Sequence, residues 1–227
     1  MRAVVLLSGG LDSTVCMAVA KHRGYEVFPL SFHYQQRHCI ELENARKVAN
    51  FFGVSRHLVI ETNMGEFGGS ALTDPDIAVP LGDITRRDIP STYVPARNLI
   101  FLSYALGYAE ALQAEKIFIG VNALDYSGYP DCRPEFISLF QQLADYSTKA
   151  AVQDKQRISI ETPLIQLSKK DIILLGAELK APFELTHSCY RGGVKACGTC
   201  DSCLLRLKGF AEAGFADPVP YEASNDL

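Results

Sequence analysis

The chain has 227 residues, of which 48% are hydrophobic and 21% charged, and its formal net charge is −4. A chain of this length can bury its own core without covalent cross-links, and its mildly acidic composition gives no general attraction to nucleic acid or to an acidic membrane surface. No apolar run approaches the roughly 18 residues of a membrane span. We therefore expect a cytoplasmic protein that binds neither membrane nor nucleic acid directly. In that compartment its seven cysteines should be reduced thiols or metal ligands.

Short apolar runs alternate with amphipathic stretches along most of the chain. The predicted strands lie at residues 2–7, 26–32, 56–60, 116–121 and 157–161. The predicted helices lie at residues 13–23, 40–52 and 98–114, from about residue 135, and at 169–180, the last beginning after a capping pair of Ser168 and Asp171. A long loop at 61–95 interrupts the pattern. Strands that alternate with helices predict an α/β fold with a parallel sheet.

The string Ser8-Gly9-Gly10-Leu11-Asp12-Ser13 follows the first predicted strand and opens the first predicted helix. Ligands of open parallel sheets bind beyond the carboxyl ends of the strands, where a helix N-terminus offers unpaired N–H groups to an anion. The two glycines let the backbone approach phosphate closely, the serines can donate hydrogen bonds, and Asp12 is expected to hold Mg²⁺. A tight turn with a capping serine is the alternative, but chance produces this string in about one window in a million.

Four cysteines cluster near the C-terminus with the spacing C-x7-C-x2-C-x2-C: Cys189, Cys197, Cys200 and Cys203. Four thiolates suit tetrahedral zinc, and a closed shell of four protein ligands predicts a structural metal that adds folding energy to a short tail. Buried thiols, a redox pair and an iron–sulfur cluster are the alternatives. His187 is a substitute ligand if one cysteine does not bind.

The Ser8–Ser13 string resembles the PP-loop of ATP pyrophosphatases, which cleave ATP between its α- and β-phosphates. Further segments narrow the resemblance: FHYQQRH at 32–38, YVPARN at 93–98, SGYPDCRPEF at 127–136, and SCY with CGxCxxC between 188 and 203. Together, over residues 2 to about 218, they are similar to the QueC family of 7-cyano-7-deazaguanine synthases.

The resemblance implies a Rossmann-like, five-stranded sheet with helices on both faces, in a PP-loop ATP-binding domain at 1–180, and a zinc-binding segment at 181–227 packed on it. It implies an ATP-dependent ligase of queuosine biosynthesis that converts 7-carboxy-7-deazaguanine and ammonia to the nitrile through an adenylated carboxylate and an amide. Free ammonium is the expected nitrogen source, ATP, Mg²⁺ and Zn²⁺ are the expected cofactors, and a homodimer is the expected assembly.

Site residues follow from the same motifs. ATP is expected to contact one continuous run: Leu7, Ser8, Gly9, Gly10, Leu11, Asp12, Ser13 and Thr14. Lys169 and Arg97 are candidate catalytic cations beside Asp12, with a solvated lysine and an ion-pair partner as the alternatives. Tyr129 can stack on the substrate ring, and Asp131 can accept hydrogen bonds from a guanine-like edge, unless it is only a turn residue. His33 and His38 are candidates near the nucleotide or packed loop histidines, and Asp125 is a candidate second metal ligand.

Two other functions stay open. A PP-loop enzyme that thiolates tRNA would need a thiol near ATP, for which Cys16 and Cys132 are candidates, and a basic surface that the composition disfavours. A zinc-bearing regulator would bind nucleotide tightly without turnover. Neither accounts for residues 127–136.

Overall fold

The computed structural model describes residues 1–37, 40–86, 88–124, 129–154 and 156–223. Its centre is a five-stranded sheet in the order β3-β2-β1-β4-β5 in which every neighbouring pair is parallel. The strands are β1 (Arg2–Leu6), β2 (Glu26–His33), β3 (Leu58–Glu61), β4 (Lys116–Phe118) and β5 (Ser159–Glu161). This architecture confirms the predicted α/β fold, although the last three strands are shorter than predicted.

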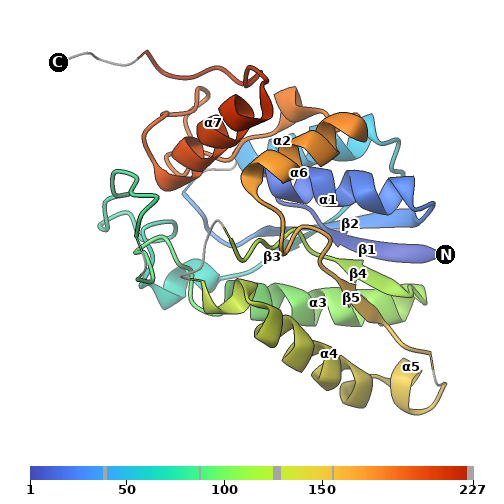
Figure 1. The fold of residues 1–227 in the computed structure, drawn as a ribbon. Coiled ribbons are helices and arrows are strands. Elements are labelled where there is room, and N and C mark those ends of the chain that lie inside the picture. The colour runs from blue at the N-terminus through green and yellow to red at the C-terminus, as the bar shows by residue number, and fades with distance from the viewer. Residues whose placement is uncertain (38–39, 87, 125–128, 155, 224–227) are drawn as a thin grey trace.

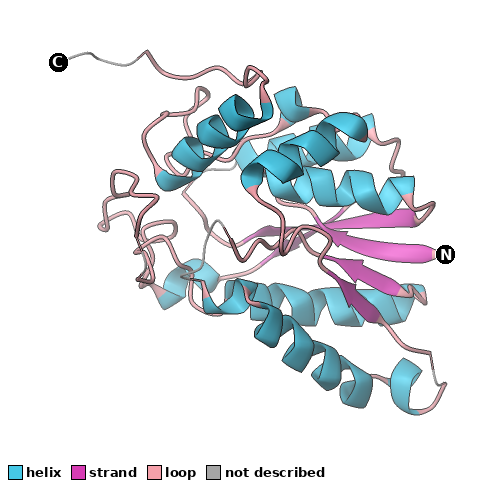
Figure 2. Cartoon of the chain, in the orientation of Figure 1, coloured by secondary structure: helices cyan, strands magenta, loops and turns pink. Residues whose placement is uncertain are grey.

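Helices cover both faces of the sheet (Figures 1 and 2). They are α1 (Leu11–His22), α2 (Ile40–Phe51), α3 (Arg97–Leu112), α4 (Pro134–Ser147), α5 (Lys149–Val152), α6 (Lys169–Glu178) and α7 (Asp201–Ala213). Helices α3 and α4 lie on one side of the sheet, and α1, α2, α6 and α7 lie on the other (Figure 1).

The central strand β1 shows why the two layers form. Val4 and Leu6 point into the core shared with α3 and α4, whereas Ala3 and Val5 point into the core shared with α1 and α6. Both faces of a parallel strand are buried, so its sequence is a continuous apolar run rather than an alternating one. The order of the strands reverses at β1 and β4, which puts the ligand-binding crevice of such a sheet at their carboxyl ends.

Helix α7 is the largest element that the sequence did not predict. Its buried residues recur at helical spacing, but they include Asp201 and Arg206, so the apolar stripe that identifies a helix is interrupted. Helix α7 packs on α6, and a Cβ on Gly209 would collide with the side chain of Lys169. The start of α6 is as predicted, because Ser168 and Asp171 form a reciprocal capping box.

Candidate active site

A cavity of about 250 Å³ opens at the carboxyl ends of β1, β2 and β4. Its wall is built from the loop after β1, the end of β2, the start of α3, the loop after β4, the start of α6 and the segment that leads into α7. Elements from both helical layers and from the C-terminal segment therefore share one site.

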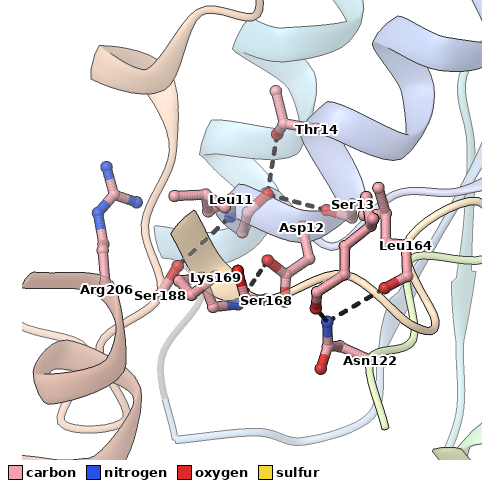
Figure 3. Close-up of polar contacts among 12 residues, drawn as sticks. Leu11, Asp12, Ser13, Thr14, Asn122, Leu164, Ser168, Lys169, Ser188 and Arg206 are labelled. Carbon is pink, nitrogen blue, oxygen red and sulfur yellow. Dashed lines mark hydrogen bonds and ion pairs between the residues drawn. The ribbon is translucent and has the colours of Figure 1, made fainter. Parts of the chain in front are cut away.

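The loop after β1 is held in shape by its own serines. Ser8 N–H donates to Ser13 Oγ at 3.2 Å, the two hydroxyls lie 3.0 Å apart, and Gly10 N–H donates to Ser8 Oγ at 3.3 Å. Thr14 Oγ1 donates to the Gly10 carbonyl at 2.9 Å (Figure 3). Gly10 is the N-cap of α1 and offers no side chain to cap it, and the next three residues of the helix, Leu11, Asp12 and Ser13, line the cavity, with the Leu11 N–H donating to Ser188 Oγ at 3.4 Å.

Gly9 is the position of this loop that tolerates no side chain. Its φ of +84° is one that L side chains rarely adopt, and a Cβ there would collide with the backbone oxygen of Glu41 and lie 2.7 Å from the backbone nitrogen of Ala45. The phosphate loop and the first turn of α2 are consequently in direct contact.

Asp12 and Lys169, predicted separately to hold a metal and a phosphate, meet in an ion pair. Lys169 Nζ lies 2.7 Å from Asp12 Oδ1 and 2.8 Å from Oδ2 (Figure 3), and the lysine and aspartate side chains are 11% and 25% exposed. Both line the cavity. Asn122 ties the loop after β4 to the segment before α6 beside them, because its Nδ2 donates to the carbonyls of Leu164 and Leu167 at 3.1 and 2.6 Å.

Arg97 and Tyr129, predicted for catalysis and substrate binding, also line the cavity. Arg97 is the first residue of α3 and donates to the hydroxyl of Tyr34 at 3.3 Å. The Tyr129 hydroxyl lies 2.9 Å from Thr92 Oγ1, and its ring packs against that of Tyr93 with centroids 5.7 Å apart. Tyr34 and the stacked pair Phe32 and Phe101 add aromatic surface to the same wall.

Asp131 does not lie in this wall, as far as the described residues show. Its buried carboxylate accepts the backbone N–H of Asn98 at 2.9 Å, and its carbonyl accepts Asn98 Nδ2 at 3.2 Å, so it secures the start of α3. This arrangement gives the predicted contact with a guanine-like edge no support. His33 ends β2 and is likewise not among the described residues of the wall, and His38 and Asp125 lie outside the described residues.

Several residues of the wall were not predicted. Their shared feature is that no motif assigned them a site role: Gln36, Glu41, Asn122, Ser202, Leu205 and Arg206. Two nevertheless lie within recognised motifs, Gln36 in the segment at 32–38 and Ser202 between two of the clustered cysteines. Burial raises the pKa of Glu41 to about 6, and the positive charge of Arg97 limits that rise. A carboxylate at the start of a predicted helix was visible in the sequence, but nothing there indicated which way it faces.

The four clustered cysteines are buried, and their sulfur atoms lie close together. All four Sγ atoms lie within 4.8 Å of one another, and those of Cys197 and Cys203 are 3.9 Å apart. Tetrahedral zinc with Zn–S bonds of about 2.3 Å separates its sulfur ligands by about 3.8 Å. The cluster therefore has dimensions that fit the predicted metal.

The other described cysteines are buried thiols. Cys132 lies in the cavity wall, where burial raises its pKa to about 12, and burial also raises the pKa of Cys16. Neither is therefore a ready thiolate. In the described part of the chain, no helix has both the length and the apolar character needed to cross a bilayer.

Comparison with known proteins gives one consistent family. Residues 2–214 match the family model described as queuosine biosynthesis protein QueC. The 7-cyano-7-deazaguanine synthase 2 of Desulfitobacterium hafniense (strain Y51) is 60% identical over 226 residues, covering 99% of this chain and 95% of that protein. The 7-cyano-7-deazaguanine synthase of Acetivibrio thermocellus is 60% identical over 222 residues, covering 97% of each.

Solved structures agree on the fold. A 4-thiouridine synthetase in complex with RNA and ATP matches with a TM-score of 0.52 and 18% identity over 94% of this chain and 50% of that one. The NMN synthetase of Francisella tularensis matches with a TM-score of 0.50 and 15% identity over 95% and 87%. The family matches span nearly the whole chain, and the chain therefore belongs to the QueC family of 7-cyano-7-deazaguanine synthases of queuosine biosynthesis.

Proposed function

We propose that the chain is an ATP-dependent ligase that converts 7-carboxy-7-deazaguanine and ammonia into 7-cyano-7-deazaguanine. This proposal rests on a PP-loop that borders a cavity lined by aromatic side chains and cations. The family model matches nearly the whole length of the same chain. A carboxylate is a poor electrophile because oxide is a poor leaving group. Attack of the substrate carboxylate on the α-phosphate of ATP would release pyrophosphate and turn that oxygen into a good leaving group.

Ammonia would then displace AMP to give the amide. In a second activation step the amide oxygen would be activated, and the loss of this oxygen would leave the nitrile. The residues from Leu7 to Thr14 would hold ATP, with the backbone N–H groups and hydroxyls around Gly10 directed at the pyrophosphate. Lys169 and Arg97 would neutralise the charge that develops on the phosphates. Tyr129 and its aromatic neighbours would stack on the deazaguanine ring.

Asp12 is the residue proposed to hold Mg²⁺. It is an acidic side chain beside the phosphate loop, and its carboxylate faces the cavity together with Lys169. Magnesium bound there with the ATP phosphates would neutralise charge on the leaving pyrophosphate. Lys169 would then share or exchange its contacts with Asp12 for contacts with phosphate.

The cysteine cluster is proposed to hold a structural zinc ion. Residues 1–180 would form the ATP-binding domain and residues 181–227 the zinc-binding segment. Four cysteine ligands leave no open coordination position, so the metal would organise the segment rather than act on the substrate. The thiolating alternative has weaker support, because the cavity thiol of Cys132 has a raised pKa.

A homodimer is proposed through the outward face of α4. Leu139, Leu143 and Tyr146 are 66%, 52% and 84% exposed, and Phe136, which is partly buried and also packs against the core, lies at the same helical spacing one turn earlier. The stripe is symmetric about position 141, so two antiparallel copies would pair Phe136 with Tyr146 and Leu139 with Leu143, as a two-fold interface requires. The stripe carries no charge, so two acidic chains could meet there without repulsion.

Mass spectrometry of a reaction containing 7-carboxy-7-deazaguanine, ATP, Mg²⁺ and ammonium would test the function. We expect the substrate to be replaced by the nitrile in wild-type protein and to persist with Asp12→Ala. If folded protein that binds ATP yields neither amide nor nitrile, the proposed reaction is wrong.

A further inference from the structure

The cavity holds one carboxylate besides Asp12 in its described wall, and that carboxylate belongs to Glu41. Asp12 is paired with Lys169, and Arg206 in the same wall is paired with Asp217. No hydrogen bond or ion pair among the described residues involves the Glu41 carboxylate. It is therefore an available hydrogen-bond acceptor inside the site.

The fold holds Glu41 against the phosphate loop. Its backbone oxygen packs against Gly9, and the carbonyl of Gly9 accepts the backbone N–H of His187 at 2.9 Å. Ser188, the next residue, approaches the first N–H of α1 at Leu11 with a distance of 3.4 Å (Figure 3). Glu41 and His187 consequently flank the loop beside which the adenylated carboxyl group would form.

His187 supplies a second acceptor. Its side chain is 5% exposed, it lines the cavity, and its Nε2 is buried without a hydrogen-bond partner in the described part of the chain. The ring is a hydrogen-bond partner of Cys189, so that bond falls to Nδ1. Donation of Nδ1–H to sulfur leaves Nε2 with a lone pair directed away from the cysteine cluster.

Two hydrogen-bond acceptors beside the carboxyl group that reacts would suit the binding of ammonium. Ammonium has only N–H donors and a positive charge, and it cannot attack until it loses a proton. We infer, on the basis of the proposed function, that Glu41 and His187 Nε2 bind ammonium and that Glu41 is the catalytic residue that takes its proton.

The proton and electron pairs balance along this route. The Glu41 carboxylate takes one proton from NH₄⁺, and the freed nitrogen lone pair forms the C–N bond with the adenylated carboxyl carbon. The C–O bond to AMP breaks with its electron pair on the departing oxygen. Loss of a second N–H proton gives the amide, and both protons pass to solvent before the next turnover.

The ionisation of Glu41 suits this task. Burial raises its pKa to about 6 against the opposing charge of Arg97. At neutral pH the group is then mainly a carboxylate, yet it is a stronger base than an exposed glutamate. Tyr34, whose pKa is raised by burial and which also faces Glu41, stays protonated in this range.

Glu41→Gln, with Glu43→Gln on the exposed side of the same helix as a matched control, tests the inference. Three rates are compared at neutral pH: carboxylate-dependent pyrophosphate release, amide formation with ammonium, and hydroxamate formation with hydroxylamine. Hydroxylamine is mostly uncharged at this pH and needs no base to become nucleophilic.

We expect Glu41→Gln to retain pyrophosphate release and hydroxamate formation and to lose about 100-fold or more in amide formation with ammonium, in the range of general-base catalysis. Raising the pH toward the pKa of ammonium should restore part of that loss, and Glu43→Gln should behave as wild type. Equal losses with both nucleophiles, or loss of pyrophosphate release, would overturn the inference and assign Glu41 to binding the ring or nucleotide. Absence of pyrophosphate release in the wild type would instead refute the proposed function.

Discussion

The ion pair between Arg206 and Asp217 offers the sharpest test of what holds the C-terminal segment in place. Arg206 Nε lies 2.7 Å from Asp217 Oδ2 and Nη2 lies 2.9 Å from Oδ1, and both side chains are 3% exposed. Asp217 also accepts the Tyr221 hydroxyl at 2.6 Å and the Val219 N–H at 3.2 Å. One carboxylate thus organises α7 and the segment that follows it.

Asp217→Ala removes all four of these bonds and leaves a buried guanidinium that keeps the Phe210 ring, with its centroid 5.3 Å from Cζ, and two hydrogen-bond acceptors, Thr186 Oγ1 at 2.7 Å and the Phe183 carbonyl at 3.3 Å. Removing one member of a buried pair costs about 3–5 kcal/mol, because the other charge stays desolvated. For a chain of this size that loss lowers the melting temperature by about 6–20 °C. Thermal unfolding followed by circular dichroism, with zinc present throughout, measures it.

Glu212 on the same helix provides the control. It pairs with Lys208 at 3.8 Å with both side chains about half exposed, so Glu212→Ala should cost less than about 0.5 kcal/mol. The double change Arg206→Met with Asp217→Leu removes both charges and should recover much of the stability lost in Asp217→Ala. Equal melting temperatures for Asp217→Ala and Glu212→Ala would refute the account of a buried pair that stabilises this segment.

Two further predictions concern the metal and the assembly. Cys203→Ser should lower the zinc content from one ion per chain to a small fraction and should lower the melting temperature, whereas Cys16→Ala should keep its zinc. Elemental analysis after gel filtration measures the zinc. Undiminished zinc in Cys203→Ser, or iron in place of zinc, would contradict the proposed site. Leu143→Lys should convert a dimer to a monomer, because a charge would be buried at the centre of the interface, whereas Phe51→Lys, at a comparably exposed apolar position, should leave the dimer intact. Light scattering coupled to gel filtration measures the assembly, and a monomeric wild type would rule the interface out.

The parts of the molecule that could be predicted are those where neighbouring residues act together. The β1 run, the turn at Gly9 and Gly10 and the start of α1 are adjacent in sequence, so their periodicity and turn chemistry identify the phosphate loop. The cysteine spacing is local in the same way. These features need no knowledge of the tertiary structure.

The residues that escaped prediction depend on contacts between distant segments. Glu41 lies in the first turn of an amphipathic helix, and it joins the cavity only because Gly9 allows that turn to approach the phosphate loop. In the sequence, Asp131 is a carboxylate that could bind a ligand, but in the structure it accepts the backbone N–H of Asn98 at the start of α3. Sequence can indicate the chemistry of a side chain, whereas its partner is decided by packing.

Helix α7 links the cysteine cluster to the cavity, which gives the proposed structural metal a functional consequence. Cys200 is the N-cap of α7 and Cys203 lies in its first turn, while Ser202, Leu205 and Arg206 of the same turns line the cavity. A metal that binds the two cysteines would fix the start of the helix and so the position of that wall. Loss of the metal should therefore disturb the C-terminal side of the cavity, including His187 and Ser188, which directly precede Cys189 and contact the phosphate loop.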